Sequence, residues 1–223
     1  MLRKLVGHNI IGFDLTYLDQ SDLIHEGTGH DFFNARGYWS DIFFDTMRRW
    51  HPRDMISLDQ LAKALGHPKG KNGNGKHFYA LPDDQKEEYL TNDLKLVEFV
   101  FNKMNKESKR ICDDAIIFDI ETAPLRDDVI ESLIPEFNPD SVKVGNLKDP
   151  AKIEEKIEQA RENHLQSYID KAGLEAKYSI PCAIGYIISG KVELHFDEPK
   201  ELINRFWKVC GQVWSHNMEV KLK

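Results

Sequence analysis

Residues 115–121 form an almost uninterrupted apolar run, Ala-Ile-Ile-Phe-Asp-Ile-Glu, in the middle of the chain. A short run of this kind predicts a strand that is covered on both faces. Asp119 and Glu121 are two residues apart, so their carboxylates would project from the same face of that strand. Two such carboxylates repel each other and are poorly solvated, and a divalent cation would relieve both costs. An edge strand whose acids face water would give the same pattern.

Two further carboxylates occupy positions in predicted helices from which they could point toward the same site. Asp14 follows the point at which the apolar run 3–9 would pass into a helix, near the positive end of the helix dipole. Tyr89 and Asp93 are four residues apart in the helical pattern of 82–104, so they share one helix face. Each signal also has an ordinary interpretation, with Asp14 as a simple N-terminal helix residue and Asp93 as a surface acid beside a half-buried tyrosine.

Composition excludes several classes of protein. Of the 223 residues, 41% are hydrophobic and 30% are charged, which excludes a fibrous or fully disordered chain. No apolar run approaches the ~18 residues that span a bilayer, so we expect no membrane segment. The cysteines are odd in number and far apart, which fits a reducing cytoplasm better than a disulfide framework or a zinc cluster. The net charge of −7 disfavours a protein that binds polyanions through bulk charge.

The remaining pattern alternates helices and strands. Ser57 is a plausible N-cap for a short helix, and Ser189-Gly190 separates two β-rich runs as the turn of a hairpin does. The expected elements are helices at 57–66, 150–170 and 198–209, hairpin strands at 181–188 and 191–196, and a last strand at 212–217.

Taken together, three segments resemble the motifs of a known enzyme family. Phe-Asp-Ile-Glu-Thr-Ala-Pro at 118–124 resembles motif I of the DEDD 3′–5′ exonucleases. Gly-His-Asn-Ile-Ile-Gly-Phe-Asp-Leu at 7–15 resembles motif II, and Tyr-x-x-x-Asp at 89–93 resembles motif III. The tyrosine indicates the DEDDy branch of these DnaQ-like enzymes, in particular exonucleases related to the proofreading domain of family B DNA polymerases. The resemblance implies an α/β ribonuclease H-like fold, a mixed β-sheet flanked by helices.

The resemblance also implies a role for each motif residue. Asp119 would bridge two divalent cations, Mg²⁺ or Mn²⁺, and Glu121, Asp14 and Asp93 would complete the ligand set. Tyr89 would orient the attacking water, because a phenol with a pKa near ~10 positions water better than it deprotonates it.

Three other residues would contact the substrate. Asn9 and Phe13 would touch the terminal nucleotides, the ring of Phe13 offering a stacking surface that tolerates any base. Thr122 would reach the same end of the strand. The implied reaction is phosphodiester hydrolysis at the 3′ end of a single-stranded nucleic acid, with DNA favoured over RNA. A polymerase or another replication protein is an open candidate for a partner.

The motifs stand in an unusual order. In the family motif I precedes motifs II and III, whereas here motif I comes last. We interpret the chain as a single exonuclease domain, 1–223, that is circularly permuted. The expected segments are 1–104 with motifs II and III, a linker at 105–113, and 114–217 with motif I.

The permutation cuts the chain at a strand that should be central in the sheet. Leu-Val-Gly-His-Asn at 5–9 and Val-Trp-Ser-His-Asn at 213–217 both resemble the end of that strand. We expect the first copy to take the central position in a monomer, because the second lacks the Phe-Asp pair. The alternatives are a swapped dimer or longer assembly, and a non-catalytic nucleic-acid-binding or assembly remnant whose site the permutation disrupts.

Other polar residues receive less specific interpretations. Lys69, Lys71 and Lys76 in a glycine-rich loop would either cradle a nucleic-acid backbone or stay solvated. Asp45 matches a residue of the related exonucleases, and we assign it no catalytic role. Residues 152–161 are expected to form a solvated helix face.

Overall fold

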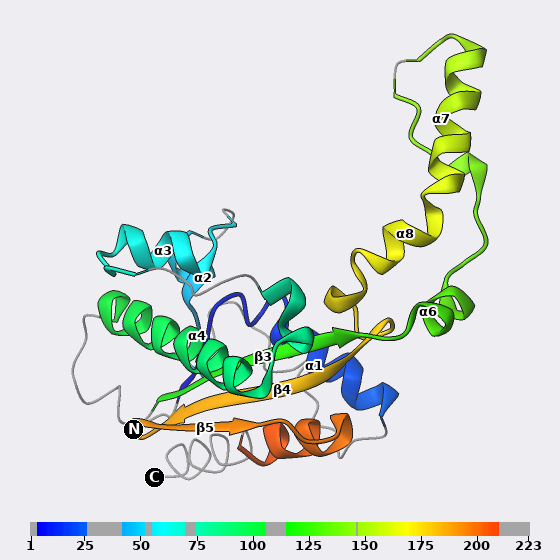
Figure 1. Cartoon of the computed structure of the whole chain (residues 1–223). Helices are drawn as coiled ribbons and strands as arrows, with labels where there is room; N and C mark the ends of the chain where they lie inside the picture. The colour runs from blue at the N-terminus through cyan, green and yellow to red at the C-terminus, as the bar shows by residue number, and fades with distance from the viewer. Residues whose placement is uncertain are drawn as a thin grey trace, which may run out of the picture.

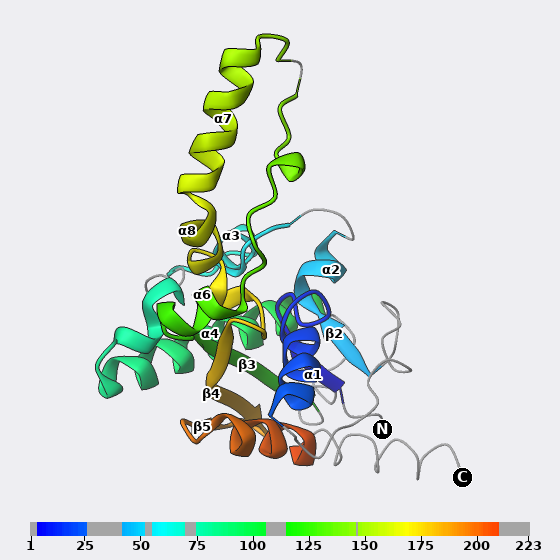
Figure 2. The ribbon, with the colours of Figure 1, turned by 90° about the vertical axis from the view of Figure 1, so that its right-hand side faces the viewer.

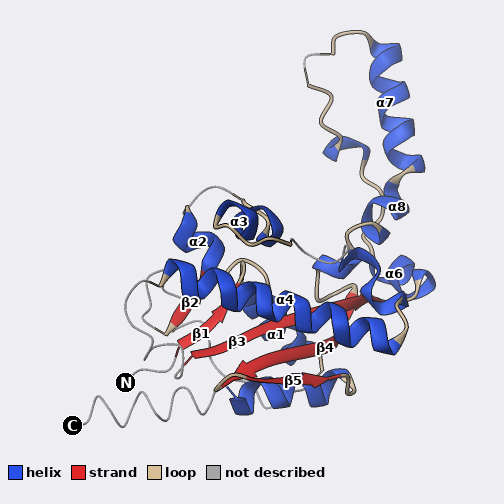
Figure 3. Cartoon of the chain, turned by 60° about the vertical axis from the view of Figure 1, so that its left-hand side comes forward, coloured by secondary structure: helices blue, strands red, loops and turns tan. Residues whose placement is uncertain are grey.

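The computed structural model describes residues 4–25, 42–51, 55–69, 75–105, 115–145 and 147–209. In these ranges the chain forms a five-stranded mixed β-sheet with helices on both faces (Figures 1 and 3). The predicted α/β class, a mixed sheet flanked by helices, is therefore confirmed. In the order in which they lie side by side, the strands are β2 (Phe43–Asp45), β1 (Lys4–Gly7), β3 (Ala115–Pro124), β4 (Ser179–Ile188) and β5 (Lys191–His195).

The first strand, β1, lies inside the sheet. It pairs in parallel with β2 on one side and with β3 on the other. The pairs β3–β4 and β4–β5 are antiparallel. β1 therefore occupies the internal position that we expected for the first copy of the repeated strand end. The second copy at 213–217 lies outside the described residues, as do residues 106–113 of the expected linker.

Helices connect the strands and cover the sheet. The helices predicted at 57–66, 82–104 and 198–209 are all present, each within two residues of its predicted ends. The helical elements are α1 (Asp14–Ile24), α2 (Thr46–Trp50), α3 (Leu58–Ala64), η2 (Gly75–Ala80), α4 (Asp83–Met104), α6 (Asp127–Leu133), η3 (Pro139–Ser141), α7 (Pro150–Glu162), α8 (His164–Ile169), η4 (Ala172–Leu174) and an unlabelled helix at 199–209. Each helix in the described ranges is too short or too polar to cross a lipid bilayer.

Local sequence explains where α3 begins and where the β4–β5 hairpin turns. The Ser57 hydroxyl accepts a hydrogen bond from the Gln60 N–H at 3.2 Å, and the Gln60 side chain accepts one from the Ser57 N–H at 3.3 Å. This capping box satisfies two backbone groups that a helix start leaves unpaired. In the hairpin, Ser189 has φ 51° and Gly190 has φ 77°. Two successive positive φ values are what a tight turn between right-twisted strands requires.

Two apolar layers hold the helices against the two faces of the sheet. α1 and helix 199–209 pack on one face, where Phe118 and Trp207 are fully buried. α3 and α4 pack on the other face, where Ile117 and Leu94 are buried. Because successive residues of a strand point to opposite faces, β3 contributes to both layers.

Between β3 and β4 the chain leaves the sheet and forms an arm that carries α6, η3, α7 and α8. Figures 1 and 2 show α7 extending away from the sheet. No residue of α7 is buried, as expected for a solvated helix face. The prediction of one helix over 150–170 was wrong at Asn163, where α7 ends and α8 begins. Asn163 is the C-cap of α7: its side chain donates a hydrogen bond to the Gln159 carbonyl at 2.8 Å, and its backbone N–H donates to the same carbonyl at 3.1 Å.

Candidate metal centre

Three carboxylates meet where α4 crosses β3. Oxygen atoms of Asp93, Asp119 and Glu121 lie within 4.8 Å of one another. Asp93 is fully buried, and the other two side chains are half-buried. Carboxylates this close repel one another, and oxygen ligands in such a cluster suit a hard cation such as Mg²⁺ or Mn²⁺. The chemistry of the donor set therefore fits the cations that the sequence predicted.

Two of these acids project from the face of β3 that α4 covers. Ala115 and Ile117 belong to the apolar layer under α3 and α4, whereas Phe118 belongs to the opposite layer. The alternation of side chains along a strand then places Asp119 and Glu121 on the α4 side. The edge-strand alternative is wrong for β3, because the strand lies between β1 and β4. β1 pairs with its first residues, Ala115 to Ile117, and β4 pairs with it at Asp119 and Glu121.

A glycine on β4 lets α4 approach the sheet closely. Gly185 is the register partner of Asp119 across β3 and β4. A Cβ atom at Gly185 would lie 2.6 Å from Leu94 Cδ1, 3.0 Å from Leu90 Cγ and 3.1 Å from Leu194 Cδ2, so a larger residue would require these leucines to shift. Asp93 is the neighbour of Leu94 on the same helix. Gly185 therefore leaves room for the leucines of α4 beside Asp119, a feature that our sequence analysis did not anticipate.

Asp14 approaches the cluster from the first residue of α1. Its side chain is 4% exposed, and burial, then the charge of Asp119 and the charge of Asp45, raise its pKa well above the ordinary value. Hydrogen bonding from the backbone of Asp14 itself and of Ile120 acts in the opposite direction. Asp14 lies outside the group of three whose oxygens are within 4.8 Å. Its electrostatic coupling to Asp119 nevertheless places all four predicted acids in one region.

Asp45 organises the turn from which Asp14 emerges. Its buried carboxylate accepts hydrogen bonds from the backbone N–H groups of Asn9 and Ile11, each at 3.0 Å. It also accepts from the N–H groups of Met47 and Arg48 at 3.1 and 3.2 Å, as the N-cap of α2. The sequence signal was an acid that ends an apolar run just before a helix. We assigned Asp45 no catalytic role, and its contacts indicate a positioning role.

Tyr89 lies one helical turn before Asp93 on the buried side of α4. Its side chain is 5% exposed, and its ring packs against Phe78 with centroids 5.6 Å apart. The predicted sharing of one helix face by Tyr89 and Asp93 is therefore confirmed.

The three predicted substrate contacts have different surroundings. Asn9 has φ 62°, and its buried Oδ1 has no hydrogen-bond partner among the described residues. Phe13 is half-buried and packs against Tyr17 with ring centroids 5.6 Å apart. The Thr122 hydroxyl donates to the Gly173 carbonyl at 2.5 Å, so it retains only acceptor capacity for a substrate. Of the basic loop, residues 70–74 lie outside the described residues, and the side chains of Lys71 and Lys76 are not described.

Comparison of the chain with protein-family models, with curated proteins and with solved structures found no match.

Proposed function

We propose that this chain is a Mg²⁺- or Mn²⁺-dependent 3′–5′ exonuclease that acts on single-stranded nucleic acid, with DNA as the favoured substrate. One observation carries the proposal. Asp93, Asp119 and Glu121 come from two motifs that are distant in sequence, and their oxygens lie within 4.8 Å of one another. Asp14, from motif II, interacts with Asp119 through its charge. All four acids that the family resemblance implies as ligands thus lie in one region.

The sheet topology supports a ribonuclease H-like domain that is permuted in sequence. β1 carries motif II at its carboxyl end and pairs in parallel with β3, which carries motif I. The carboxyl ends of parallel neighbours meet at one edge of a sheet, so the two motifs approach each other whichever comes first in the chain. α4 then brings motif III over β3. An internal β1 also supports a site that is completed within one chain.

In phosphodiester hydrolysis, the acids would bind the metal ions and Tyr89 would position the attacking water. Two bound cations would stabilise charge on both the attacking and the leaving oxygen. Asp119 would be the shared ligand, since it neighbours Asp93 and Glu121 and is coupled to Asp14. The Tyr89 hydroxyl would hold and orient the attacking water. The buried ring contact of Tyr89 with Phe78 would keep that hydroxyl in one position.

Digestion of labelled single strands tests the proposal. Strands of DNA and RNA, labelled at the 5′ or the 3′ end, are incubated with Mg²⁺, Mn²⁺ or EDTA. We expect stepwise shortening from the 3′ end with release of mononucleotides, and no shortening in EDTA. Asp119→Asn should abolish the activity, whereas Asp140→Asn, which changes an exposed acid on the arm, should not.

Two results would contradict the proposal. Shortening that persists in EDTA would exclude metal-dependent hydrolysis, and full activity of Asp119→Asn would exclude this cluster as the site. A chain that binds the strands but leaves them intact under every metal condition would instead favour the non-catalytic remnant.

A further inference from the structure

A cavity of about 420 Å³ opens beside the N-terminal end of α4. Its walls come from η2, from the start of α4, from β4 and from the residue that follows β5. Three aromatic side chains line it: Phe78 is 1% exposed, Tyr79 is 44% exposed and Phe196 is 42% exposed. A volume of this size with aromatic walls is typical of pockets for small organic ligands. The rings of Tyr79 and Phe196 are therefore partly open to solvent.

The charges of the cavity are unfavourable for a phosphate. Lys86 lines the cavity, and its amine forms an ion pair with Asp83 at 3.0 Å. Asp83 and Glu87 also line the cavity, so two carboxylates accompany one amine. A phosphate placed here would meet net negative charge. An uncharged, flat and polarisable group, such as a nucleobase, matches both the rings and the charge.

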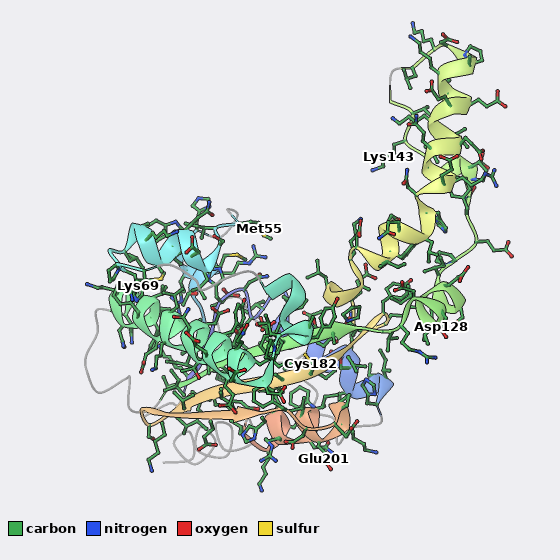
Figure 4. The ribbon with its side chains drawn as sticks, in the orientation of Figure 1. Met55, Lys69, Asp128, Lys143, Cys182 and Glu201 are labelled. Atoms are coloured by element: carbon green, nitrogen blue, oxygen red, sulfur yellow. The ribbon has the colours of Figure 1, made fainter. Side chains whose placement is uncertain are left out.

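Two residues that line the cavity lie next to residues of the candidate site. Cys182 lines the cavity, and Figure 4 shows it beside the N-terminal end of α4. Ala183, the residue after Cys182, is the register partner of Glu121 across β3 and β4, so the Glu121 carboxylate lies close to the cavity wall. In agreement, burial and next the charge of Glu121 raise the pKa of the Cys182 thiol to about 12. On the other side, the cavity residue Phe78 packs against Tyr89. The cavity is therefore adjacent to the place where the scissile phosphodiester would lie.

We propose that this cavity is a nucleobase subsite, in which Tyr79 and Phe196 hold one base of the strand whose phosphodiester lies at the acidic cluster. The inference rests on the proposed function and adds to it a binding site outside the three motifs. Aromatic stacking accepts any base, so the subsite would increase affinity for the strand without reading its sequence. It would act on binding more than on the chemical step, because Tyr79 and Phe196 line the cavity, whereas the acidic cluster consists of Asp93, Asp119 and Glu121.

The test combines binding and hydrolysis. Affinity for a 5′-fluorescein-labelled oligothymidylate of about ten nucleotides is measured by fluorescence anisotropy with Ca²⁺, and kcat and KM are measured with Mg²⁺. The double variant Tyr79→Ala, Phe196→Ala should raise both Kd and KM about tenfold and leave kcat within about twofold. The conservative variant Tyr79→Phe, Phe196→Tyr should bind like the wild type. Val192→Ala changes an exposed apolar side chain of β5 that does not line the cavity, and it should have no effect.

Substrates with one abasic site, placed at successive positions from the 3′ end, locate the base. In the wild-type protein one position should weaken binding by the same factor as the double variant does. In the double variant that position should cause no further loss. Unfolding temperatures of all variants are compared as a control for folding. The variants should stay folded, because more than two fifths of each substituted residue is exposed.

The outcomes separate this inference from the proposed function. If the wild type digests the strand and the double variant equals Val192→Ala in Kd and KM, the subsite is excluded while the exonuclease stands. If the wild type binds but does not digest, the exonuclease fails, and loss of binding in the double variant still supports the subsite. If the wild type does not bind the strand at all, both proposals are overturned.

Discussion

The backbone N–H of Asn9 donates a hydrogen bond to the buried carboxylate of Asp45 at 3.0 Å. Two residues later the N–H of Ile11 donates to the other oxygen of the same carboxylate at 3.0 Å. Asp45 ends β2, whereas Asn9 follows β1, so this pair of bonds fixes the turn that leads from β1 to Asp14. A buried acid that carries no expected role in hydrolysis thus holds a predicted metal ligand in place.

Replacing Asp45 tests this positioning role. Asp45→Asn keeps the shape of the side chain but removes the charge and one acceptor, and a charged hydrogen bond of this kind contributes about 1.5–3 kcal/mol. We expect the unfolding free energy to fall by about that amount and kcat to fall at least about tenfold, because the turn would no longer hold Asp14 against Asp119. Titration with Mn²⁺ should show weaker binding than in the wild type. Wild-type Mn²⁺ affinity in a folded Asp45→Asn protein would contradict the role.

The raised pKa of Asp14 predicts that the ionised carboxylate destabilises the folded protein when no metal is bound. The folded state binds the Asp14 proton more tightly than the unfolded state does, so stability is lost as pH rises from the unfolded pKa, near ~3.9, through the folded pKa. Asp14→Asn cannot ionise at this position. In EDTA we expect it to be more stable than the wild type at pH 7, with a difference that shrinks as the pH approaches 4.

Urea unfolding of both proteins across this pH range measures the difference. The same substitution should abolish exonuclease activity, since the amide is a poor replacement for an anionic ligand. A wild-type protein that is the more stable of the two at pH 7 without metal would contradict the prediction.

Gly185→Ala should lift α4 from the sheet. The added Cβ would lie 2.6 Å from Leu94 Cδ1, and overpacking of this kind costs about 1–3 kcal/mol. We expect reduced stability and reduced activity together, because Asp93 moves away from Asp119. Gly173→Ala is the matched control for stability alone, since its Cβ would meet only the Thr122 hydroxyl at an ordinary 3.6 Å. The double variant Gly185→Ala, Leu94→Ala should be more stable than the sum of the two single effects predicts, and simple additivity would argue against the clash.

Divalent cations should stabilise the folded chain through the acidic cluster. At a concentration of about 100 times the Kd, a ligand that binds only the folded state adds about 2.7 kcal/mol. We therefore expect Mn²⁺ to raise the unfolding temperature of the wild type by several degrees and to leave that of Asp93→Asn nearly unchanged. Asp140→Asn should respond like the wild type. An equal shift in the wild type and in Asp93→Asn would place metal binding elsewhere.

Much of the local structure could be predicted from residue order alone. The capping box at Ser57, the glycine turn at Gly190 and the apolar periodicity of α4 each depend on a few neighbouring residues, and all three appear as expected. The prediction failed at Asn163, where α7 ends and α8 begins although the apolar periodicity continues. The pattern at Asp119 was also ambiguous, because an exposed edge strand and a covered strand can both end in acids.

The sequence by itself determined which residue types could build a metal site and which faces of β3 and α4 they occupy, since those depend only on the periods of strands and helices. It did not determine how near the faces come to each other. That distance depends on packing between segments far apart in the chain: Gly185 under Leu94, and Asp45 bonded to the turn after β1. Periodicity is local and can be read along the chain, whereas the contacts that bring Asp93, Asp119 and Glu121 within 4.8 Å exist only after the sheet and its helices have packed.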